Sequence, residues 1–336
     1  MRPHTGKYEM TFHSLSIYFD TISFESSRLE MTDLLADLFG KCQGEEVAAV
    51  CYLMTARLAP MFIPIEFNVA EKSILKTLQG IVHKYGGNGE YVSDQYDKIG
   101  DLGDVAYHVV EKFASGVTKS KQRSVLNVYD RMWEIAAISG TGSVETRNDK
   151  IAGLLESGSP VEAKYIVRIL LKEMRLGSSD KTVLDALSVL KKGDKQDRDE
   201  LDRAFGVGSD LGYIAMRYVN GGSAAIREIT ITPGIPVFSM LVEREKDSEA
   251  IIKRIPRAIV QPKFDGLRCQ IHIGVNEEKD FTDRLWWKRW DEVNGVDSPS
   301  LFDASEEDDG IRLFSRNLED MTKMFPDVVA AARQLD

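Results

Sequence analysis

Apolar side chains recur every three or four positions from Thr11 to Tyr218, and this helical periodicity constrains the fold more than any other feature of the chain. It predicts two helices between Thr11 and Phe39, a third from about Glu45 to Pro60 and a fourth from Val69 to Val82. Proline ends the third helix because it lacks the amide proton that the next turn needs. A loop rich in Gly, Asn and Asp is expected from Gly86 to Asp101.

Further helices are predicted between Val125 and Tyr218, and one connection among them contains two glycines. Gly140-Thr141-Gly142 precedes a predicted helix that contains Arg147. The free backbone amides at a helix N-terminus suit a phosphate oxygen. A plain connection between two helices, capped by Ser143, has the same pattern, so both interpretations remain open.

The pattern changes after Gly221-Gly222, where we predict a linker. A chain of 336 residues is long enough for two domains, each with its own core. We therefore expect an α+β protein with an all-helical domain over residues 1–222 and a second domain over residues 223–336. In the second domain, the alternating residues Cys269–Ile273 predict a strand.

Two short motifs stand out in the second domain. Gln261-Pro262-Lys263-Phe264-Asp265-Gly266-Leu267-Arg268 leads into the predicted strand, and Phe314-Ser315-Arg316-Asn317-Leu318-Glu319-Asp320 follows some fifty residues later. Lys-x-Asp-Gly alone is a weak pattern, since Asp-Gly is a common turn. Together the two motifs resemble those of the covalent nucleotidyltransferases and, with their flanks, those of archaeal and eukaryotic ATP-dependent DNA ligases.

The resemblance implies that Lys263 becomes bonded to AMP, with ATP and Mg²⁺ as cofactors. The attack needs a neutral amine, so the pKa of the lysine must lie below its ordinary value near 10.4. Arg268 and Arg316 offer forked donors to phosphate or ribose oxygens, and Gly266 lets the backbone approach the nucleotide. Asp265 could orient the amine or cap the turn. Gln261 stands where the family usually has a glutamate that accepts from adenine, and its amide oxygen can accept the same bond.

A second, independent resemblance lies in the helical part. Pro160–Arg168 and Met174-Arg175-Leu176-Gly177 resemble the DNA-binding domain of the same ligases, which holds duplex DNA by its backbone. Scattered cations and helix N-termini bind backbone phosphates and do not contact the bases. An enzyme that acts on nicks at any sequence requires such binding. The candidate DNA-binding residues are Gly140, Gly142, Arg147, Lys164, Arg168 and Arg175.

The net charge of −10 is concentrated in one stretch. Residues 276–310 hold twelve Asp or Glu against four Lys or Arg, which leaves only −2 for the rest of the chain. The family has a short hairpin turn here, so we interpret this stretch, with Trp286, Trp287 and Trp290, as an acidic insertion that forms a self-packed surface excursion. We assign it no function.

Pro233–Leu241 resembles the entry strand of the family's adenylation domain, so the resemblance implies an antiparallel, β-rich nucleotidyltransferase domain. The chain stops at Asp336, where the family continues with metal-binding glutamates, an aromatic that stacks on adenine, a lysine motif and an OB-fold domain. We therefore expect a truncated protein that holds no metal site and forms no Lys263–AMP adduct by itself. The alternatives are a non-catalytic DNA-binding fragment and a nucleotidyltransferase of the RNA-ligase or capping type.

Composition indicates the compartment and the partners. Three cysteines without zinc-binding spacing, no signal-peptide run and no apolar segment of membrane-spanning length predict a soluble, cytoplasmic protein, associated with the nucleoid if prokaryotic. Nicked duplex DNA is the expected partner, together with a sliding clamp or other replication and repair proteins, and we expect a monomer.

Overall fold

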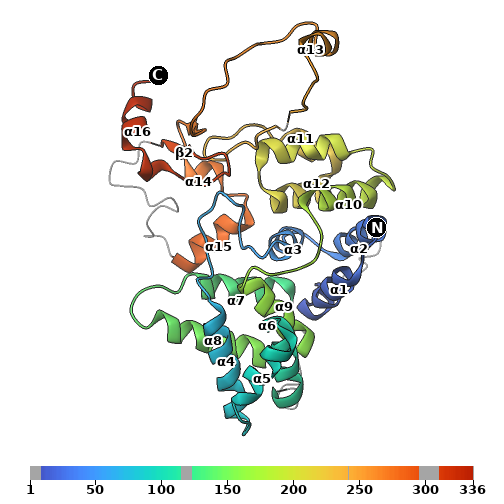
Figure 1. Cartoon of the computed structure of the whole chain (residues 1–336), viewed down its shortest axis with the longest axis vertical. Helices are drawn as coiled ribbons and strands as arrows, with labels where there is room; N and C mark the ends of the chain where they lie inside the picture. Colours follow the sequence, from blue (N-terminus) through green and yellow to red (C-terminus); the bar gives the residue numbers. More distant parts are fainter. Residues whose placement is uncertain (1–8, 115–122, 241, 295–309, 336) are drawn as a thin grey trace, which may run out of the picture.

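The computed structural model describes residues 9–114, 123–240, 242–294 and 310–335, and helices dominate these ranges (Figure 1). We call residues 9–227 the helical half. Its helices are α1 (Phe12–Phe24), α2 (Arg28–Lys41), α3 (Glu46–Met54), α4 (Glu71–Lys84), α5 (Glu90–Ile99), α6 (Leu102–Val109), the π-helical turn η1 (Val110–Ala114), α7 (Val125–Ala136), α8 (Ser143–Glu156), α9 (Pro160–Leu170), α10 (Asp180–Lys192), α11 (Arg198–Gly208) and α12 (Leu211–Arg227).

The helical half consists of two packed groups. Helices α2, α3, α10, α11 and α12 contact one another, and α4, α5, α6, α8 and α9 form the second group. Helices α1 and α7 join the groups, because α1 packs on α9 and α7 packs on α3. At the second junction the rings of Tyr52 and Tyr129 stack with 6.3 Å between their centroids, and the hydroxyl of Tyr129 donates to the carbonyl of Leu58 at 2.5 Å. The predicted helices of this half are confirmed, except that the third ends at Met54 and not at Pro60.

One predicted loop was wrong. The segment predicted as a loop from Gly86 to Asp101 contains helix α5, because Val92 is buried and Tyr96 and Ile99 pack beside it at helical spacing. Charged residues between them hid this pattern. At Gly221-Gly222, where a linker is predicted, Gly222 takes the non-helical angles φ 65° and ψ −158° and kinks α12, and a domain boundary there stays a prediction.

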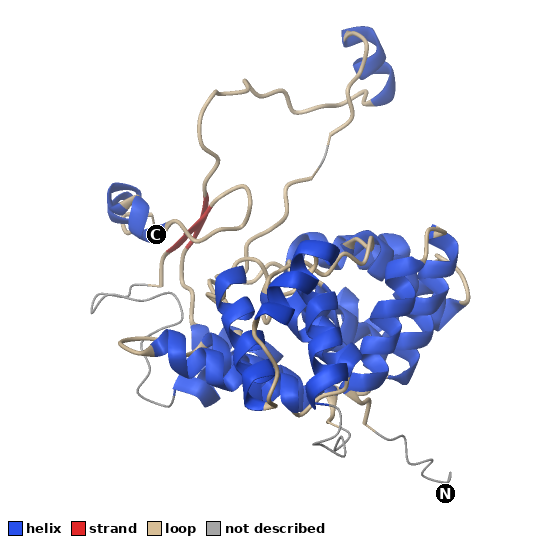
Figure 2. Ribbon diagram, turned by 60° about the horizontal axis from the view of Figure 1, so that its bottom comes forward, coloured by secondary structure: helices blue, strands red, loops and turns tan. Residues whose placement is uncertain are grey.

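The rest of the chain forms smaller elements: α13 (Ser248–Arg254), β1 (Gln270–His272), α14 (Glu277–Asp280), α15 (Leu285–Asn294), β2 (Arg312–Phe314), η2 (Thr322–Met324) and α16 (Pro326–Ala332). Strands β1 and β2 are antiparallel, with Gln270 opposite Phe314 and His272 opposite Arg312. The strand predicted at Cys269–Ile273 is thus confirmed in its central residues. Figure 2 shows this strand pair beside the helical half.

The entry strand predicted at Pro233–Leu241 is absent from its described residues, 233–240, which form a turn and an extended segment. A side chain replaces the strand ladder here. The amide of Gln270 accepts from Val237 N and donates to Val237 O, both at 2.9 Å. The order of a helical half followed by antiparallel strands agrees with the coarse α+β prediction, and the β-rich nucleotidyltransferase domain stays a prediction.

The stretch predicted as a self-packed surface excursion is instead attached to the helical half. Phe281 and Trp286 are fully buried, and α15 packs against α7. No partner for these aromatic residues could be predicted, because the surface that buries them lies far away along the chain. Residues 295–309 of the same stretch are outside the described residues.

Candidate nucleotidyl-transfer and DNA-binding sites

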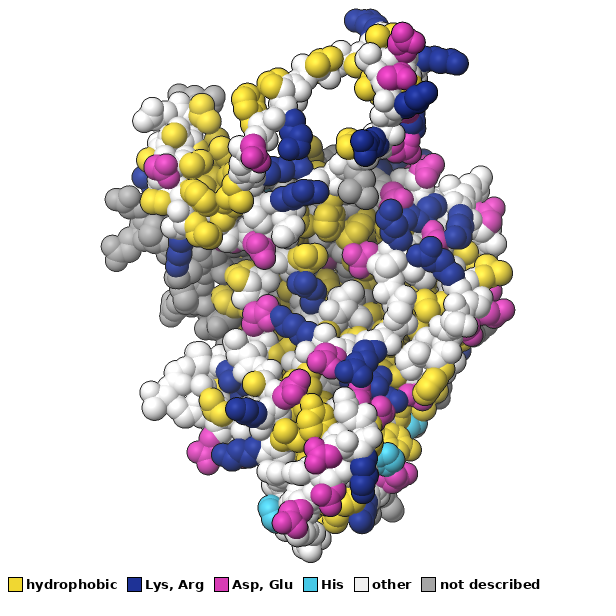
Figure 3. All heavy atoms as spheres, viewed as in Figure 1, with side chains coloured by type: hydrophobic (Ala, Val, Ile, Leu, Met, Phe, Trp, Pro, Cys, Tyr) yellow, Lys and Arg dark blue, Asp and Glu magenta, His cyan; other side chains and the backbone are white. Residues whose placement is uncertain are grey.

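Lys263 lies on a long exposed segment, residues 239–268, which we call the arm. The arm projects from the body of the protein and carries α13 at its far end (Figure 1). Gln261, Lys263, Asp265 and Gly266 are all exposed, and Gly266 has a positive φ of 155°. The arm also exposes large apolar side chains, among them Met240, Ile259, Val260 and Phe264. Figure 3 shows Lys and Arg side chains along it.

The strand register places the two candidate arginines at one end of the strand pair. Because Gln270 pairs with Phe314, the residues two positions further out, Arg268 and Arg316, follow at the same end. Both are exposed, and Arg268 donates to the hydroxyl of Ser239 at the base of the arm. Lys263 precedes Arg268 by five residues on the arm, and this end of the sheet carries one arginine from each motif.

A compact loop presents Arg316. The hydroxyl of Ser315 accepts from the amides of Asn317 and Glu319, each at 3.2 Å, and Ser315 N donates to Glu319 O at 2.9 Å. Leu318 takes a positive φ of 67° and is fully buried beneath the loop. Leu318 is buried and the backbone closes on Ser315, whereas Arg316 and Asn317 are exposed, so the loop presents these two side chains to solvent.

The two arginines provide hydrogen-bond donors for phosphate oxygens, and Lys263 provides a primary amine. These are the groups that transfer of a phosphoryl group to nitrogen requires. The same residues do not include a set of metal ligands. Within the described ranges, no group of three or more His, Cys, Asp or Glu side chains is placed to hold a metal ion. The residues described do not fit a magnesium site, and a requirement for Mg²⁺ stays a prediction.

In the helical half, Gly140 and Gly142 form the turn before α8, with φ of 83° and 79°, and both are exposed. A Cβ on either would meet nothing within 4 Å, so positive φ and not crowding explains glycine here. Arg147 is buried and donates to the carbonyls of Ile138, at 2.6 Å, and Asn68, at 3.4 Å. Its guanidinium therefore holds the turn in place from below.

The other three DNA-binding candidates meet in one ionic network at the start of α6. Arg168 contacts Asp101 and Asp104, both at 3.2 Å, and Lys164 contacts Asp104 at 3.0 Å. Arg175 joins through Asp101 at 2.9 Å. The side chains of Arg168 and Lys164 are only 9% and 10% exposed, whereas that of Arg175 is 54% exposed. Arg175 is thus the member of the network that solvent, or a phosphate, can reach.

The network needs α6 and α9 to approach closely. A Cβ at Gly103 on α6 would lie 2.9 Å from the carbonyl oxygen of Lys164 and 2.7 Å from the side chain of Arg168. Burial of the Lys164 ammonium lowers its pKa, but bonds to Asp20 and Asp104 outweigh burial, so the pKa is raised from its ordinary value. The lysine therefore stays charged at neutral pH.

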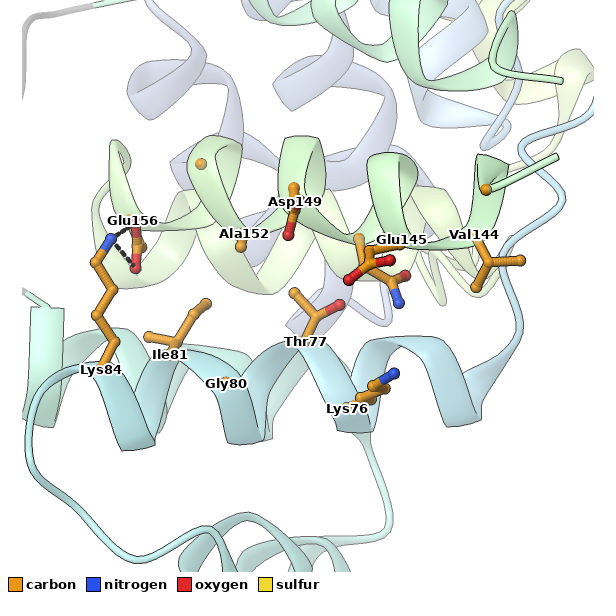
Figure 4. Close-up of a pocket in the computed structure, with 13 residues that line it drawn as sticks. Lys76, Thr77, Gly80, Ile81, Lys84, Val144, Glu145, Asp149, Ala152 and Glu156 are labelled. Carbon is orange, nitrogen blue, oxygen red and sulfur yellow. Dashed lines mark hydrogen bonds and ion pairs between the residues drawn. The ribbon is translucent and has the colours of Figure 1, made fainter. Parts of the chain in front are cut away.

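A groove of about 820 Å³ runs between α4 and α8, beginning at the Gly142 turn (Figure 4). Lys76 and Thr77 line it from α4, and Glu145 and Asp149 line it from α8. The ion pair between Lys84 and Glu156, at 2.7 Å, closes its far end. Charges of both signs face one another across the groove, so it is a mixed surface and not a cationic channel.

The carboxylates that bind these cations were not predicted from the sequence. Asp101 caps α6 by accepting from Asp104 N at 2.8 Å, and its position after Gly100 was a usable cap signal. Asp210 is buried at the start of α12 and holds side chains from two distant segments, which no local pattern could reveal. Among the described residues, no helix is long and apolar enough to cross a membrane.

Comparison with known proteins adds to this geometry. Residues 11–188 match the family described as DNA ligase N terminus. The chain is 36% identical over 322 residues to a probable DNA ligase of Dictyoglomus turgidum, covering 96% of this chain and 48% of the relative. It is 34% identical over 320 residues to DNA ligase 2 of Korarchaeum cryptofilum (95% and 48%), and 32% identical over 329 residues to a DNA ligase of Acidianus ambivalens (95% and 49%).

The chain therefore spans about half the length of the curated relatives it matches. The family match covers more than half of the chain, and it covers the part of the helical half that carries the network around Asp101. Lys263 and its motif follow the matched residues 11–188 and lie inside the stretch that the relatives share. The chain belongs to the family of DNA ligases.

Proposed function

We propose that this chain supplies the DNA-gripping helices and the nucleophilic lysine of a ligase that seals nicks in duplex DNA. The observation that carries the proposal is the strand register that collects the cations of two separate motifs, Arg268 and Arg316, at the end of the sheet next to the arm with Lys263. A primary amine five residues along the chain from Arg268, with Arg316 at the same end of the sheet, suits attack on a nucleotide phosphate.

In the proposed reaction, the neutral amine of Lys263 attacks the α-phosphorus of ATP. A nitrogen–phosphorus bond forms, the bond from the α-phosphorus to the bridging oxygen breaks, and pyrophosphate leaves while the amine releases a proton. An oxygen of the 5′-phosphate at the nick then attacks the phosphorus of this AMP, an oxygen–phosphorus bond forms, and the nitrogen–phosphorus bond breaks while the lysine amine takes up a proton. Finally the 3′-hydroxyl attacks that phosphate, closes the phosphodiester bond and releases AMP.

The helical half is proposed to hold the duplex through phosphates. The exposed turn at Gly140 and Gly142 presents backbone amides at the N-terminus of α8, and Arg147 fixes that turn from inside. Lys164 and Arg168 hold the carboxylates against which Arg175 is placed, so we assign them a supporting part in DNA binding and give the direct contact to Arg175.

A non-catalytic, DNA-binding role is the second candidate, and the exposure of the arm favours it. Lys263 lies among exposed residues, so a bound nucleotide must gain its walls from elsewhere. Gel-shift titrations of the chain on nicked duplex, with and without ATP, separate the two candidates. Affinity that responds to ATP supports the catalytic proposal, and affinity that ignores it supports the binding role. An RNA-ligase or capping role is disfavoured by the helical domain.

The remaining assignments also belong to this proposal. We propose ATP as the nucleotide, with Gln261 accepting from adenine, and a divalent metal such as Mg²⁺. The protein is proposed to act as a cytoplasmic monomer on chromosomal nicks. A sliding clamp is the candidate protein partner. Co-purification of the protein with a sliding clamp, with and without DNA, tests this partnership.

Arg175→Ala is expected to weaken binding to duplex DNA equally for all sequences and to reduce the salt dependence by about one phosphate contact. The reason is that Arg175 is the exposed cation of its network. Fluorescence anisotropy across a salt series measures both quantities. Arg227→Ala is the matched control, since Arg227 is also an exposed, ion-paired arginine, 65% exposed and bonded to Glu200, but lies in the other helix group. Equal effects of the two changes would contradict the assignment.

A further inference from the structure

Residues 281–293, which we call the clasp, are held by the helical half through a buried aromatic cluster. Phe281 and Trp286 are fully buried, with 5.3 Å between their ring centroids. Phe62, which follows α3, meets Trp286 edge-on at 6.1 Å and meets Phe314 of β2 at 6.5 Å. One side chain of the helical half therefore contacts both the clasp and the strand pair.

Asp210 connects the same two parts with its two carboxylate oxygens. Its Oδ1 accepts from the hydroxyl of Tyr52, at 2.6 Å, and from the amide of Tyr213, at 3.0 Å, both in the helical half. Its Oδ2 accepts from the indole of Trp286, at 2.9 Å, and from Arg284, at 3.3 Å, both in the clasp. Asp210 is fully buried, so each of these bonds is protected from water.

The outer rim of the contact is ionic. Arg289 bonds to Asp130 on α7 at 2.5 Å, and Lys288 bonds to Glu45 at 2.7 Å. Burial lowers the pKa of Arg289, but the bond to Asp130 and the charges of Asp130, Glu292 and Glu45 together outweigh burial and raise the pKa. The acceptors come from two different elements of the helical half, so the clasp rests on a surface and not on one helix.

We infer that the clasp is an intramolecular docking segment that seats the β1–β2 pair, and with it the arm bearing Lys263, on the helical half through Asp130 and Asp210. The clasp follows β1 closely, and Val275 N donates to Gly310 O at 2.9 Å where the chain returns to β2. This bond joins the two strands at the end from which the clasp continues, and Phe62 contacts both the clasp and β2. This inference stands apart from the proposed reaction, because docking is measured without DNA or nucleotide.

Charge reversal across the rim tests the inference. Three of the four tryptophans of the chain lie in the clasp, so tryptophan fluorescence reports on docking. Arg289→Asp and Asp130→Arg should each shift the emission to longer wavelength, increase quenching by acrylamide and open chymotrypsin cleavage after Trp286. The double variant restores the pair with opposite polarity and should return all three signals toward those of the unmodified protein.

Lys150→Asp is the matched control, because Lys150 bonds at 2.7 Å to Glu134, which lies on α7 one turn beyond Asp130. It should leave the fluorescence unchanged. Circular dichroism follows the helices in parallel and should stay constant in every variant. Single reversals that leave Trp286 protected, a double variant that fails to recover, or loss of helix content together with the fluorescence shift would each overturn the inference.

Discussion

Lys263→Ala is expected to abolish AMP attachment in a chimera in which this chain is joined to the part of the Dictyoglomus relative that the alignment does not cover. Incubation with ATP should add one AMP to the unmodified chimera and none to the variant, as read by mass spectrometry of the intact protein. Lys263→Arg should fail equally, since a guanidinium cannot lose its proton to attack phosphorus.

Lys253→Ala is the control for that experiment, because Lys253 is an exposed lysine of α13 on the same arm. Its adduct should be unchanged. An adduct that persists in Lys263→Ala would show that another residue is the nucleophile. On the 336-residue chain alone we expect no adduct, since Lys263 and the residues around it from Gln261 to Arg268 are exposed and do not enclose a nucleotide. An adduct there would show that the described residues suffice to position ATP.

Asp210→Ala is expected to lower the free energy of unfolding by about 3–5 kcal/mol, the cost of removing one partner of a buried ion pair. Arg284 is 5% exposed and would keep its charge beside the ring of Tyr213, and α12 would lose its N-terminal cap. Urea denaturation followed by circular dichroism measures the change. Asp210→Asn should cost less, because the amide oxygen still accepts from Tyr213 N.

Asp283→Ala provides the comparison, since Asp283 contacts the same Arg284 at 3.4 Å but is 54% exposed. An exposed ion pair contributes at most about 1 kcal/mol, so this variant should unfold close to the unmodified protein. If Asp210→Ala behaves like Asp283→Ala, the buried carboxylate is not what joins the two parts of the structure.

The helices could be predicted from the sequence wherever apolar spacing was dense, as along α1, α2 and α7. Helix α5 could not, because only Val92 is fully buried and the charged residues around it resemble those of a loop. The lysine motif and the Ser315 loop were recognisable because their chemistry is local. In each, the residues that matter are neighbours in the chain.

The bonding partners of the predicted cations could not be predicted from the sequence, because they lie far away along the chain. Arg147 bonds to carbonyl groups nine and seventy-nine positions away, so its sequence neighbourhood does not show that it is buried. Lys164 and Asp20 are 144 positions apart. The tryptophans of the clasp were visible as apolar residues, but the surface that covers Trp286 is assembled from residues near Phe62 and Asp210. Fold class depends on short-range patterns, and these sites depend on long-range contacts.

The paired hydrogen bonds between Gln270 and Val237 also limit how far Lys263 can reach. They fasten the base of the arm, and Lys263 lies seven residues before Gln270. A fully stretched backbone covers at most about 25 Å over that length. Every place where the amine of Lys263 can meet a phosphate thus lies inside a sphere of roughly that radius around Gln270, extended by the length of one lysine side chain. Lengthening the arm on this side with inserted glycines should enlarge the sphere, while an equal insertion before Ser239 should leave it unchanged.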